Sequence, residues 1–341
     1  MIIALDPGFG NTKVMTSHNG NIRSACITTS IVRNPKMVGL AAIGMRTSAS
    51  NTKFIRMKMN ENLYIDFATG PGSWKWGEPM DSFDYSSISS APRLAMFFST
   101  LSSILPPGDY IVDSLVIGLP VNLLQNIEMA KETFEDLRLL KMKHLFDTYR
   151  MYEGERTDVS QYSVNIKGID VLAQPVGAYA DYLIGEDCTL RHSAKDQEIA
   201  VVDIGMNTLD LYVVESGNVV ARYIGGSKLG VRRLYDLMRE SQGADLEIAE
   251  LDEKIANGSI KFDKDLLRLW LDDVLAEIEK TWPKLARFSA VIPAGGGAKI
   301  LGKMLVNDLS IRGASVHAVD DPVTTNVTGL YKYTAYKASK E

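Results

Sequence analysis

The chain has 341 residues, of which 45% are hydrophobic and 23% are charged, and its formal net charge at pH 7 is −5. This length exceeds one typical hydrophobic core and predicts two domains. The acidic balance argues against broad nucleic-acid binding, because no surplus of cations is present to neutralise phosphates. No apolar run reaches the roughly 18 residues of a membrane span, so we expect no membrane partner.

The cysteines and the N-terminus indicate the cellular compartment. Cys26 and Cys188 lack metal-ligand spacing and are typical of inert thiols in a reducing environment. The N-terminus enters a strand directly, which predicts that no signal peptide is present. We therefore expect a cytoplasmic protein.

The first element in chain order is a buried apolar strand that ends in an Asp-x-Gly turn and continues into a second strand, over residues 2–14. The same pattern returns at 200–211, where Asp203 takes the place of Asp6. In each copy a Gly-Asn pair follows at the same distance from the aspartate and predicts a turn into a third strand. Two matched units predict two similar α/β lobes that offer their loops to a shared cleft.

These turns have the residue types that a phosphate site needs. Glycine lets backbone N–H groups approach a phosphate, and a carboxylate at a strand end holds hydrated Mg²⁺. For either copy alone, a hairpin that happens to contain Asp and Gly is the simpler explanation. The matched spacing over two whole units favours a metal–nucleotide site.

Between the two strand–turn–strand copies, the sequence predicts an insertion and then alternating helices and strands. Residues 28–90 are rich in Ser, Asn, Met and Gly, and within them Trp74 and Trp76 alternate with lysine as on a half-exposed strand. Gln174 opens a helix at a Gln-Pro pair, where it either caps the helix or orients a water toward a terminal phosphate. The other elements expected here are helices at 91–105 and 121–140 and strands at 114–120 and 162–166.

After the second unit, the pattern predicts helices at 231–241, within 245–263 and at 266–282. The strand at 290–293 runs into Gly295, Gly296 and Gly297, which predict an exit turn at 294–298 where a ligand meets backbone N–H groups before the helix at 299–305. A tight turn without a ligand is the alternative. Neither a dinucleotide-binding nor a Walker A spacing occurs. Residues 315–319 predict a strand, and a last helix begins near 325.

Five segments, taken in order, resemble the actin / sugar-kinase / heat-shock-chaperone ATPase superfamily. Within this superfamily, the sequences of these segments are most similar to those of ParM/StbA-type bacterial and archaeal actin homologues. The segments correspond to two phosphate loops, two connecting segments and an adenosine loop, at residues 3–14, 171–180, 201–211, 291–301 and 321–331. The resemblance implies an α/β, two-lobed actin-like ATPase fold, with two related domains around a nucleotide cleft.

The resemblance also implies site residues and cofactors. Asp6 and Asp203 would hold Mg²⁺ through water, and Gln174 would orient the attacking water, so these three are the expected catalytic residues. Phe9 departs from the eukaryotic actin pattern, which has a small hydroxyl residue there. ATP or GTP would be the nucleotide. The expected nucleotide contacts are Gly8, Phe9, Gly10, Asn11, Thr12, Lys13, Gly205, Met206, Asn207, Thr208, Asp210, Gly295, Gly296, Gly297 and Lys299.

The expected domain boundaries follow from the same order. Domain I would comprise residues 1–168, with a small subdomain inserted at about 28–90, together with the C-terminal helix at about 325–341. Domain II would comprise 169–324, with a helical small subdomain at about 231–284.

The leading functional hypothesis is a filament-forming actin homologue with Mg-dependent ATP hydrolysis coupled to polymerisation. Its expected role is cytoskeletal, in plasmid or other DNA segregation, with head-to-tail self-association and a DNA-binding adaptor. A chaperone would need a substrate-binding domain after the last motif. A small-molecule kinase or phosphatase of this fold would need an acceptor pocket and a base, for which no dedicated candidate occurs. A non-polymerising nucleotide-binding scaffold is disfavoured by the intact phosphate residues.

Overall fold

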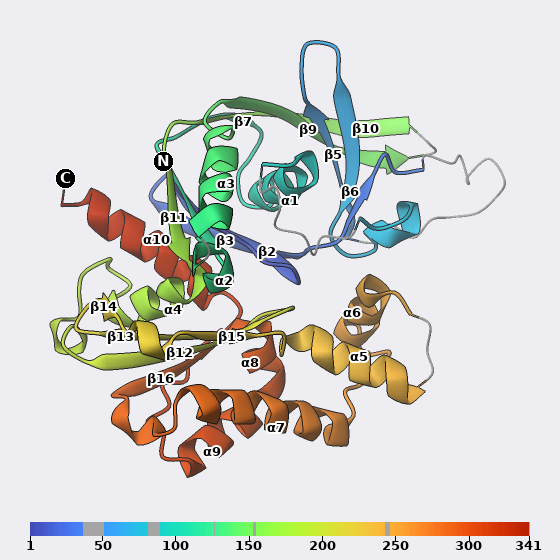
Figure 1. Cartoon of the computed structure of the whole chain (residues 1–341). Coiled ribbons are helices and arrows are strands. Elements are labelled where there is room, and N and C mark those ends of the chain that lie inside the picture. The colour runs from blue at the N-terminus through green and yellow to red at the C-terminus, as the bar shows by residue number, and fades with distance from the viewer. Residues whose placement is uncertain (37–50, 81–88, 126, 153–154, 243–245, 341) are drawn as a thin grey trace. The chain divides into compact units, whose positions relative to one another are not determined.

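The computed structural model describes residues 1–36, 51–80, 89–125, 127–152, 155–242 and 246–340. Parts of the predicted insertion, at 37–50 and 81–88, lie outside these ranges. The chain forms two compact units, each of which contains helices and a mixed sheet (Figure 1), so the predicted α/β class is confirmed. Unit 1 comprises Met1–Leu115, Glu128–Asp170 and Glu247–Asn257, and unit 2 comprises Val116–Ile127, Val171–Leu246 and Gly258–Glu341.

Unit 1 contains an antiparallel β1-β2-β3 ribbon and a six-stranded sheet of order β4-β6-β5-β9-β10-β7, in which β7 runs parallel to β10. The ribbon consists of β1 (Ile2–Pro7), β2 (Asn11–His18) and β3 (Asn21–Thr28). The sheet consists of β4 (Ile31–Arg33), β5 (Lys53–Lys58), β6 (Tyr64–Thr69), β7 (Gly108–Val112), β9 (Lys143–Tyr152) and β10 (Glu155–Ile166). The helices of this unit are α1 (Ala91–Leu101), α6 (Ile248–Ala256) and most of α3 (Ile127–Arg138).

Helix α1 covers one face of the six-stranded sheet with aromatic side chains. Phe98 of α1 stacks on Phe146 of β9 with 4.6 Å between ring centroids, and Phe146 stacks on Tyr162 of β10 at 4.8 Å. All three rings are buried, and α1 also contacts the ribbon through β2. Burial of such large rings stabilises unit 1, and the contact of α1 with β2 joins the ribbon and its β1–β2 loop to this core.

Three of the unit boundaries fall inside elements that run from one unit into the other, and the remaining two lie on either side of α6. The first three lie within β8 (Ser114–Leu119), at the start of α3, and within β11 (Ile169–Ala173), and α2 (Val121–Gln125) belongs to unit 2.

Unit 2 contains a sheet of order β14-β13-β12-β16, with β15 also paired to β13. Its strands are β12 (Glu198–Ile204), β13 (Leu209–Glu215), β14 (Asn218–Val219), β15 (Gly225–Ser227) and β16 (Ala290–Ala294). Its helices are α4 (Gln174–Leu183), α5 (Val231–Gln242), α7 (Lys264–Thr281), α8 (Gly295–Leu301), α9 (Lys303–Ile311) and α10 (Thr325–Ala338).

The side chains of β12 alternate between two helical layers. Ile199 and Val201 pack in one cluster with Ala178 and Tyr179 of α4, while α8 packs against Ile204 from the other face (Figure 1). Because β12 is buried on both faces, its run of apolar residues is nearly continuous. Asp203 interrupts this run just before the strand ends.

Helices α4 and α10 touch through their backbones. A Cβ on Gly329 would lie 1.7 Å from the carbonyl oxygen of Gly177, and a Cβ on Gly177 would lie 2.2 Å from that of Asn326. Beside this crossing, the buried Lys332 Nζ donates to Asp181 Oδ1 at 2.7 Å. The C-terminal helix α10 groups with unit 2 and α6 groups with unit 1, while the expected domain boundaries remain a prediction.

Three local predictions are wrong. Trp74 and Trp76 lie in the 3₁₀-helix Ser73–Trp76, because Gly70 and Gly72 take φ values of 81° and 75° and turn the chain. Residues 315–319 form only an isolated bridge, between Val316 and Val291. Residues 295–298 are the first turn of α8 instead of an exit loop.

The Gly-Asn turns lie one residue earlier than expected. The positive φ values belong to Asn19 and Gly20 (53° and 77°) and to Ser216 and Gly217 (49° and 78°). Consecutive residues of this kind form the tight hairpin turn that matches strand twist. Among the helices that the structure describes, none is long and apolar enough to cross a bilayer.

Candidate functional site

In unit 1 the first predicted loop is organised by a buried ion pair. Asp6 at the end of β1 is 1% exposed, and its Oδ2 accepts from Lys13 Nζ of β2 at 2.8 Å. The Lys13 ammonium therefore spans the turn, and a Cβ on Gly8 would lie 3.4 Å from it and 2.7 Å from the Asn11 carbonyl oxygen. Only glycine fits at position 8 without moving this backbone. A magnesium ion would meet an Asp6 carboxylate that already has a cation beside it.

Thr29, which the sequence analysis missed, holds this loop from the end of β3. Its Oγ1 donates to the Gly8 carbonyl oxygen at 2.8 Å, and its N–H donates to the Gly10 carbonyl oxygen at 2.8 Å. The Thr12 hydroxyl lies 3.0 Å from the Thr29 hydroxyl and is buried, so Thr12 bonds within the protein. No local sequence pattern indicates the role of Thr29, because that role depends on the register between β2 and β3.

Phe9 and Arg93 form a second contact that the sequence analysis missed. The Arg93 guanidinium carbon lies 5.2 Å from the Phe9 ring centroid, the distance of a cation–π contact. This places a cation beside the tip of the loop, where the eukaryotic pattern has a hydroxyl residue.

In unit 2 the second predicted loop rests on the start of α5. The Gly205 N–H donates to the Thr208 carbonyl oxygen at 2.8 Å and closes the turn. The Gly205 and Met206 carbonyl oxygens accept from the N–H groups of Val231 and Arg232, at 3.0 and 2.8 Å. First-turn N–H groups have no partner inside their own helix, so the loop caps α5 and is held in one conformation.

Asp203 is buried and is held by a residue from the far end of the chain. It is 4% exposed, and its Oδ2 accepts from Asn326 Nδ2 of α10 at 2.7 Å. A Cβ on Gly295 would lie 2.5 Å from the Asp203 Oδ1 atom, so α8 also approaches the carboxylate. Asn326 lies in the second connecting segment but was absent from the predicted site. Its amide fixes the orientation of the carboxylate.

Asp210 lies opposite Asp203 on the neighbouring strand and is 3% exposed. Burial raises its pKa to about 7, the Asp203 charge adds to this rise, and the hydrogen bond from Thr208 Oγ1 at 2.7 Å opposes it. At neutral pH Asp210 is thus partly protonated, so the two strands carry less than two negative charges here.

We expect Asp210 to make unit 2 less stable as the pH rises. Its pKa in the folded protein, about 7, exceeds the ordinary value of 3.8, so the folded state binds the extra proton between these values and loses this advantage as the pH rises. With EDTA and no nucleotide, we expect the free energy of unfolding to fall by roughly 2–3 kcal/mol between pH 5 and pH 8. The Asp210→Asn variant should lack this dependence in urea titrations. An equal slope in both proteins would contradict this origin.

Gln174 is the first residue of α4 and is 8% exposed. A Cβ on Gly118 of β8 would lie 3.3 Å from the Gln174 Cγ atom and 2.8 Å from Leu330 Cδ1 of α10. Pro175 follows in the first turn, where its missing N–H costs nothing. Gln174 is therefore buried, and its side chain packs beside Gly118.

Each of the three consecutive glycines has a different environment. Gly295 has φ +85° and its N–H donates to the Pro322 carbonyl oxygen at 2.7 Å, while a Cβ on Gly297 would lie 2.2 Å from Ile204 Cγ2. Both are required by the packing of α8 on β12. Gly296 has no atom within 4 Å of its Cβ position, so it is the one with free space beside it. The nearby Lys299 is exposed and pairs with Asp321 at 3.2 Å.

Unit 2 offers oxygen atoms that fit a hydrated magnesium ion. The Oδ1 atoms of Asn207 and Asn326 are buried and have no hydrogen-bond partner among the residues that the structure describes, and Asn326 bonds Asp203 through its other amide atom. Magnesium prefers oxygen ligands and keeps several waters, whose hydrogens would satisfy such acceptors. No cluster of three or more acidic, His or Cys side chains suited to a metal occurs within the described ranges.

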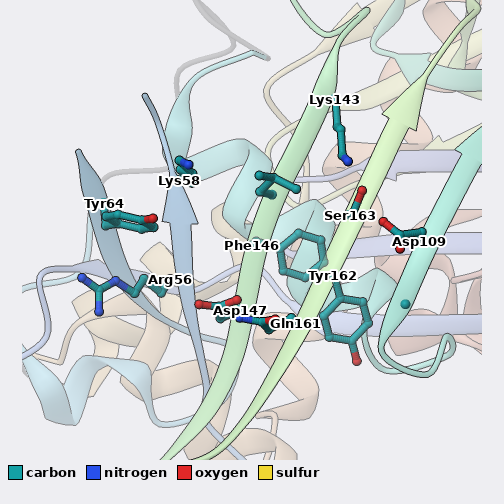
Figure 2. A pocket seen from close by; sticks show the side chains of 12 residues that line it. Arg56, Lys58, Tyr64, Asp109, Lys143, Phe146, Asp147, Gln161, Tyr162 and Ser163 are labelled. Carbon is teal, nitrogen blue, oxygen red and sulfur yellow. The ribbon is translucent and has the colours of Figure 1, made fainter. Parts of the chain in front are cut away.

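A separate hollow of about 480 Å³ is lined by side chains of the six-stranded sheet (Figure 2). Lys58 and Lys143 line it with no ion pair to any described residue, and Arg56 stacks on Tyr64 at 4.6 Å. Burial raises the pKa of Asp147, against the lowering effect of the nearby arginines. None of the predicted site residues lines this hollow, so it is distinct from the candidate site.

Family models match both parts of the chain. A model described as the N-terminal domain of actin-like proteins matches residues 4–177, just over half of the chain. A model of the C-terminal part of an archaeal MreB-like actin homologue matches residues 201–307. No curated protein sequence matches the chain significantly.

Solved structures of actin homologues match almost the whole chain. The apo pSK41 ParM protein matches with a TM-score of 0.68 and 18% identity, over 99% of this chain and 98% of that one. The archaeal actin homologue Ta0583, in complex with ADP, matches with a TM-score of 0.67 and 16% identity, over 99% and 100%. A ParM from a 15-stranded filament of Clostridium botulinum matches with 0.69 and 17%, over 98% of both.

At these identities the solved structures establish the fold, which has two actin-like lobes. The N-terminal family model covers both the first loop and the α4 start at Gln174, and the C-terminal model covers the second loop and the three glycines. The chain belongs to the actin-like protein family.

Proposed function

We propose that this protein is a nucleotide-dependent, filament-forming actin homologue that hydrolyses ATP and segregates plasmid or other DNA through an adaptor. The observation that carries this proposal is the buried Asp203 carboxylate, oriented by Asn326 at 2.7 Å beside amide oxygens that need donors. A carboxylate so placed at a strand end serves to hold a hydrated metal–nucleotide complex. The filament would be cytoplasmic and would grow head to tail.

In this proposal Asp6 and Asp203 would hold hydrated magnesium, which would supply positive charge to neutralise the phosphates. The Gly8–Lys13 and Gly205–Asp210 loops supply phosphate contacts, and Gly296, Gly297 and Lys299 contact the nucleoside. Gln174 orients the attacking water without a charge of its own, from a buried position. ATP is the expected nucleotide, with GTP as the alternative.

Two of the matched structures support the proposal by what they contain. Ta0583 is described in complex with ADP, and the Clostridium botulinum ParM is described in a filament. An interface that joins different surfaces of successive subunits generates an open filament unless its rotation closes a ring. If nucleotide favours one conformation of the subunit, the affinity between successive subunits depends on whether nucleotide is bound.

We expect Mg-ATP, or a non-hydrolysable analogue, to produce particles that pellet above a critical concentration, with phosphate release following assembly. Sedimentation and light scattering at tens of micromolar protein, with and without EDTA, measure this. The Asp203→Asn variant, which keeps the side-chain shape, serves as the matched control and should not assemble in ATP. A chain that stays monomeric with Mg-ATP and phosphorylates a small metabolite would overturn the proposal in favour of a kinase.

We expect the Gln174→Ala variant to slow hydrolysis by about 10²-fold while nucleotide affinity stays within roughly tenfold, as for the loss of a water-orienting group. Its filaments should persist longer in ATP. Phosphate release and the affinity for a fluorescent ATP analogue measure the two effects. Gln174→Glu provides a size-matched control that keeps an acceptor oxygen. A joint loss of affinity, rate and thermal stability would identify Gln174 as a packing residue only.

A further inference from the structure

Within unit 1, Glu253 of α6 contacts the 3₁₀-helix Ser73–Trp76. Glu253 Oε2 accepts from the Trp74 indole Nε1–H at 2.8 Å, and its Oε1 accepts from Lys75 Nζ at 2.9 Å. Burial would raise the pKa of this carboxyl, but the hydrogen bonds from Lys75 and Trp74 outweigh it and hold the pKa below the ordinary value. Hydrogen bonds to an ionised group are the stronger kind.

Beside these contacts, a hollow lies between α6 and this region. Its volume is about 470 Å³, and it is lined by Thr28, Ser30 and Trp74 on one side and by Ala249 and Ala256 of α6 on the other. Across such a hollow, no closely packed atoms transmit a movement of α6 to the residues on the other side. The Glu253 contacts join α6 directly to the 3₁₀-helix beside this hollow.

The 3₁₀-helix that carries Trp74 is bonded to the link between β3 and β4. The Ser73 hydroxyl lies 2.7 Å from the Ser30 hydroxyl, and both residues are buried. At the other end of the 3₁₀-helix, the Trp76 ring meets Phe54 edge-on with 4.9 Å between centroids. A movement of Trp74 thus reaches Ser30 through a short and rigid element.

Ser30 directly follows the residue that holds the phosphate loop. Thr29 donates from its hydroxyl to the Gly8 carbonyl oxygen and from its N–H to the Gly10 carbonyl oxygen, each at 2.8 Å. The path from Glu253 to the loop therefore consists of hydrogen bonds and adjacent residues throughout, and it lies within unit 1.

We infer that Glu253 is a positioning residue that acts through Trp74, Ser73 and Thr29 to hold the Gly8–Gly10 backbone and slow nucleotide release. This inference rests on the proposed nucleotide site. It assigns α6 a regulatory role, because any partner or filament contact that displaces this helix would loosen the phosphate loop.

The test compares Glu253→Ala with Glu250→Ala, a control on the same helix whose carboxylate pairs locally with Lys254 at 2.8 Å. We expect Glu253→Ala to release a fluorescent ATP analogue roughly tenfold faster and to speed hydrogen exchange at the Thr29 amide. Glu253→Gln should be intermediate, because its amide oxygen still accepts from Trp74. Glu250→Ala should match the wild type in both measurements.

A second variant, Trp74→Phe, keeps the ring and removes the donor, so it serves if Glu253→Ala does not fold. Unchanged release and unchanged Thr29 exchange in a folded variant would overturn the inference. If the wild type binds no nucleotide, the proposed function fails, while exchange at Thr29 still tests the path from α6. Faster exchange across all of unit 1 would also overturn it, since that result indicates global destabilisation.

Discussion

The Gly329→Ala variant is expected to lose about 3–5 kcal/mol of unfolding free energy, enough to unfold a marginally stable unit. In an ordinary helix interior this substitution stabilises, by roughly 0.5–1 kcal/mol. Here the new Cβ would lie 1.7 Å from the Gly177 carbonyl oxygen and 2.6 Å from the Asp181 backbone nitrogen. Both obstacles are backbone atoms, so α4 and α10 would have to separate. Urea unfolding followed by circular dichroism measures the loss.

Gly296→Ala is the matched control for this effect. It also places alanine in a helix, but no atom lies within 4 Å of its Cβ position. Its free energy of unfolding should equal that of the wild type or exceed it by up to about 1 kcal/mol. A Gly329→Ala protein as stable as this control would mean that the two helices do not approach as described. Because Asn326 lies on α10, separation should also weaken its bond to Asp203 and reduce nucleotide binding.

The Asp203→Ala variant is expected to lose Mg-dependent ATP hydrolysis by several orders of magnitude, because the phosphates lose their metal counter-charge at the reacting end. Asp203→Asn should lose nearly as much, although its amide oxygen can still accept from Asn326. This comparison separates the charge from the hydrogen bond. Phosphate release in saturating Mg-ATP is the measurement, and hydrolysis at the wild-type rate would refute the site assignment.

Stability provides an internal check on the Asp203 result. Removing this charge also removes the repulsion that helps to raise the Asp210 pKa, so Asp203→Asn should flatten the loss of stability with rising pH. Asp272→Asn is the control, since Asp272 is an exposed partner of Arg268 on α7. It should change neither hydrolysis nor the pH profile. A similar loss of activity in both variants would point to a general effect of charge.

Local sequence determined the strands, the hairpins and the loops that carry the predicted contacts. A strand or a hairpin turn depends mainly on residues that are adjacent in the sequence, so short patterns indicate it. The apolar runs before Asp6 and Asp203 and the Asn19-Gly20 turn are examples. The resemblance of five ordered segments to one superfamily added the overall α/β fold. These features need no knowledge of distant contacts.

Only the tertiary structure decided how the loops are held. Asn326 and Asp203 are 123 residues apart in the sequence, and nothing local to either residue predicts their hydrogen bond. The strand register places Thr29 within hydrogen-bond distance of the first loop. Trp74 lies in a 3₁₀-helix and donates to Glu253, which is distant in the sequence. Gly295 and Gly297 are needed mainly by the close approach of α8 to β12. Such contacts bring together residues distant in sequence, and packing selects them only after the elements have formed.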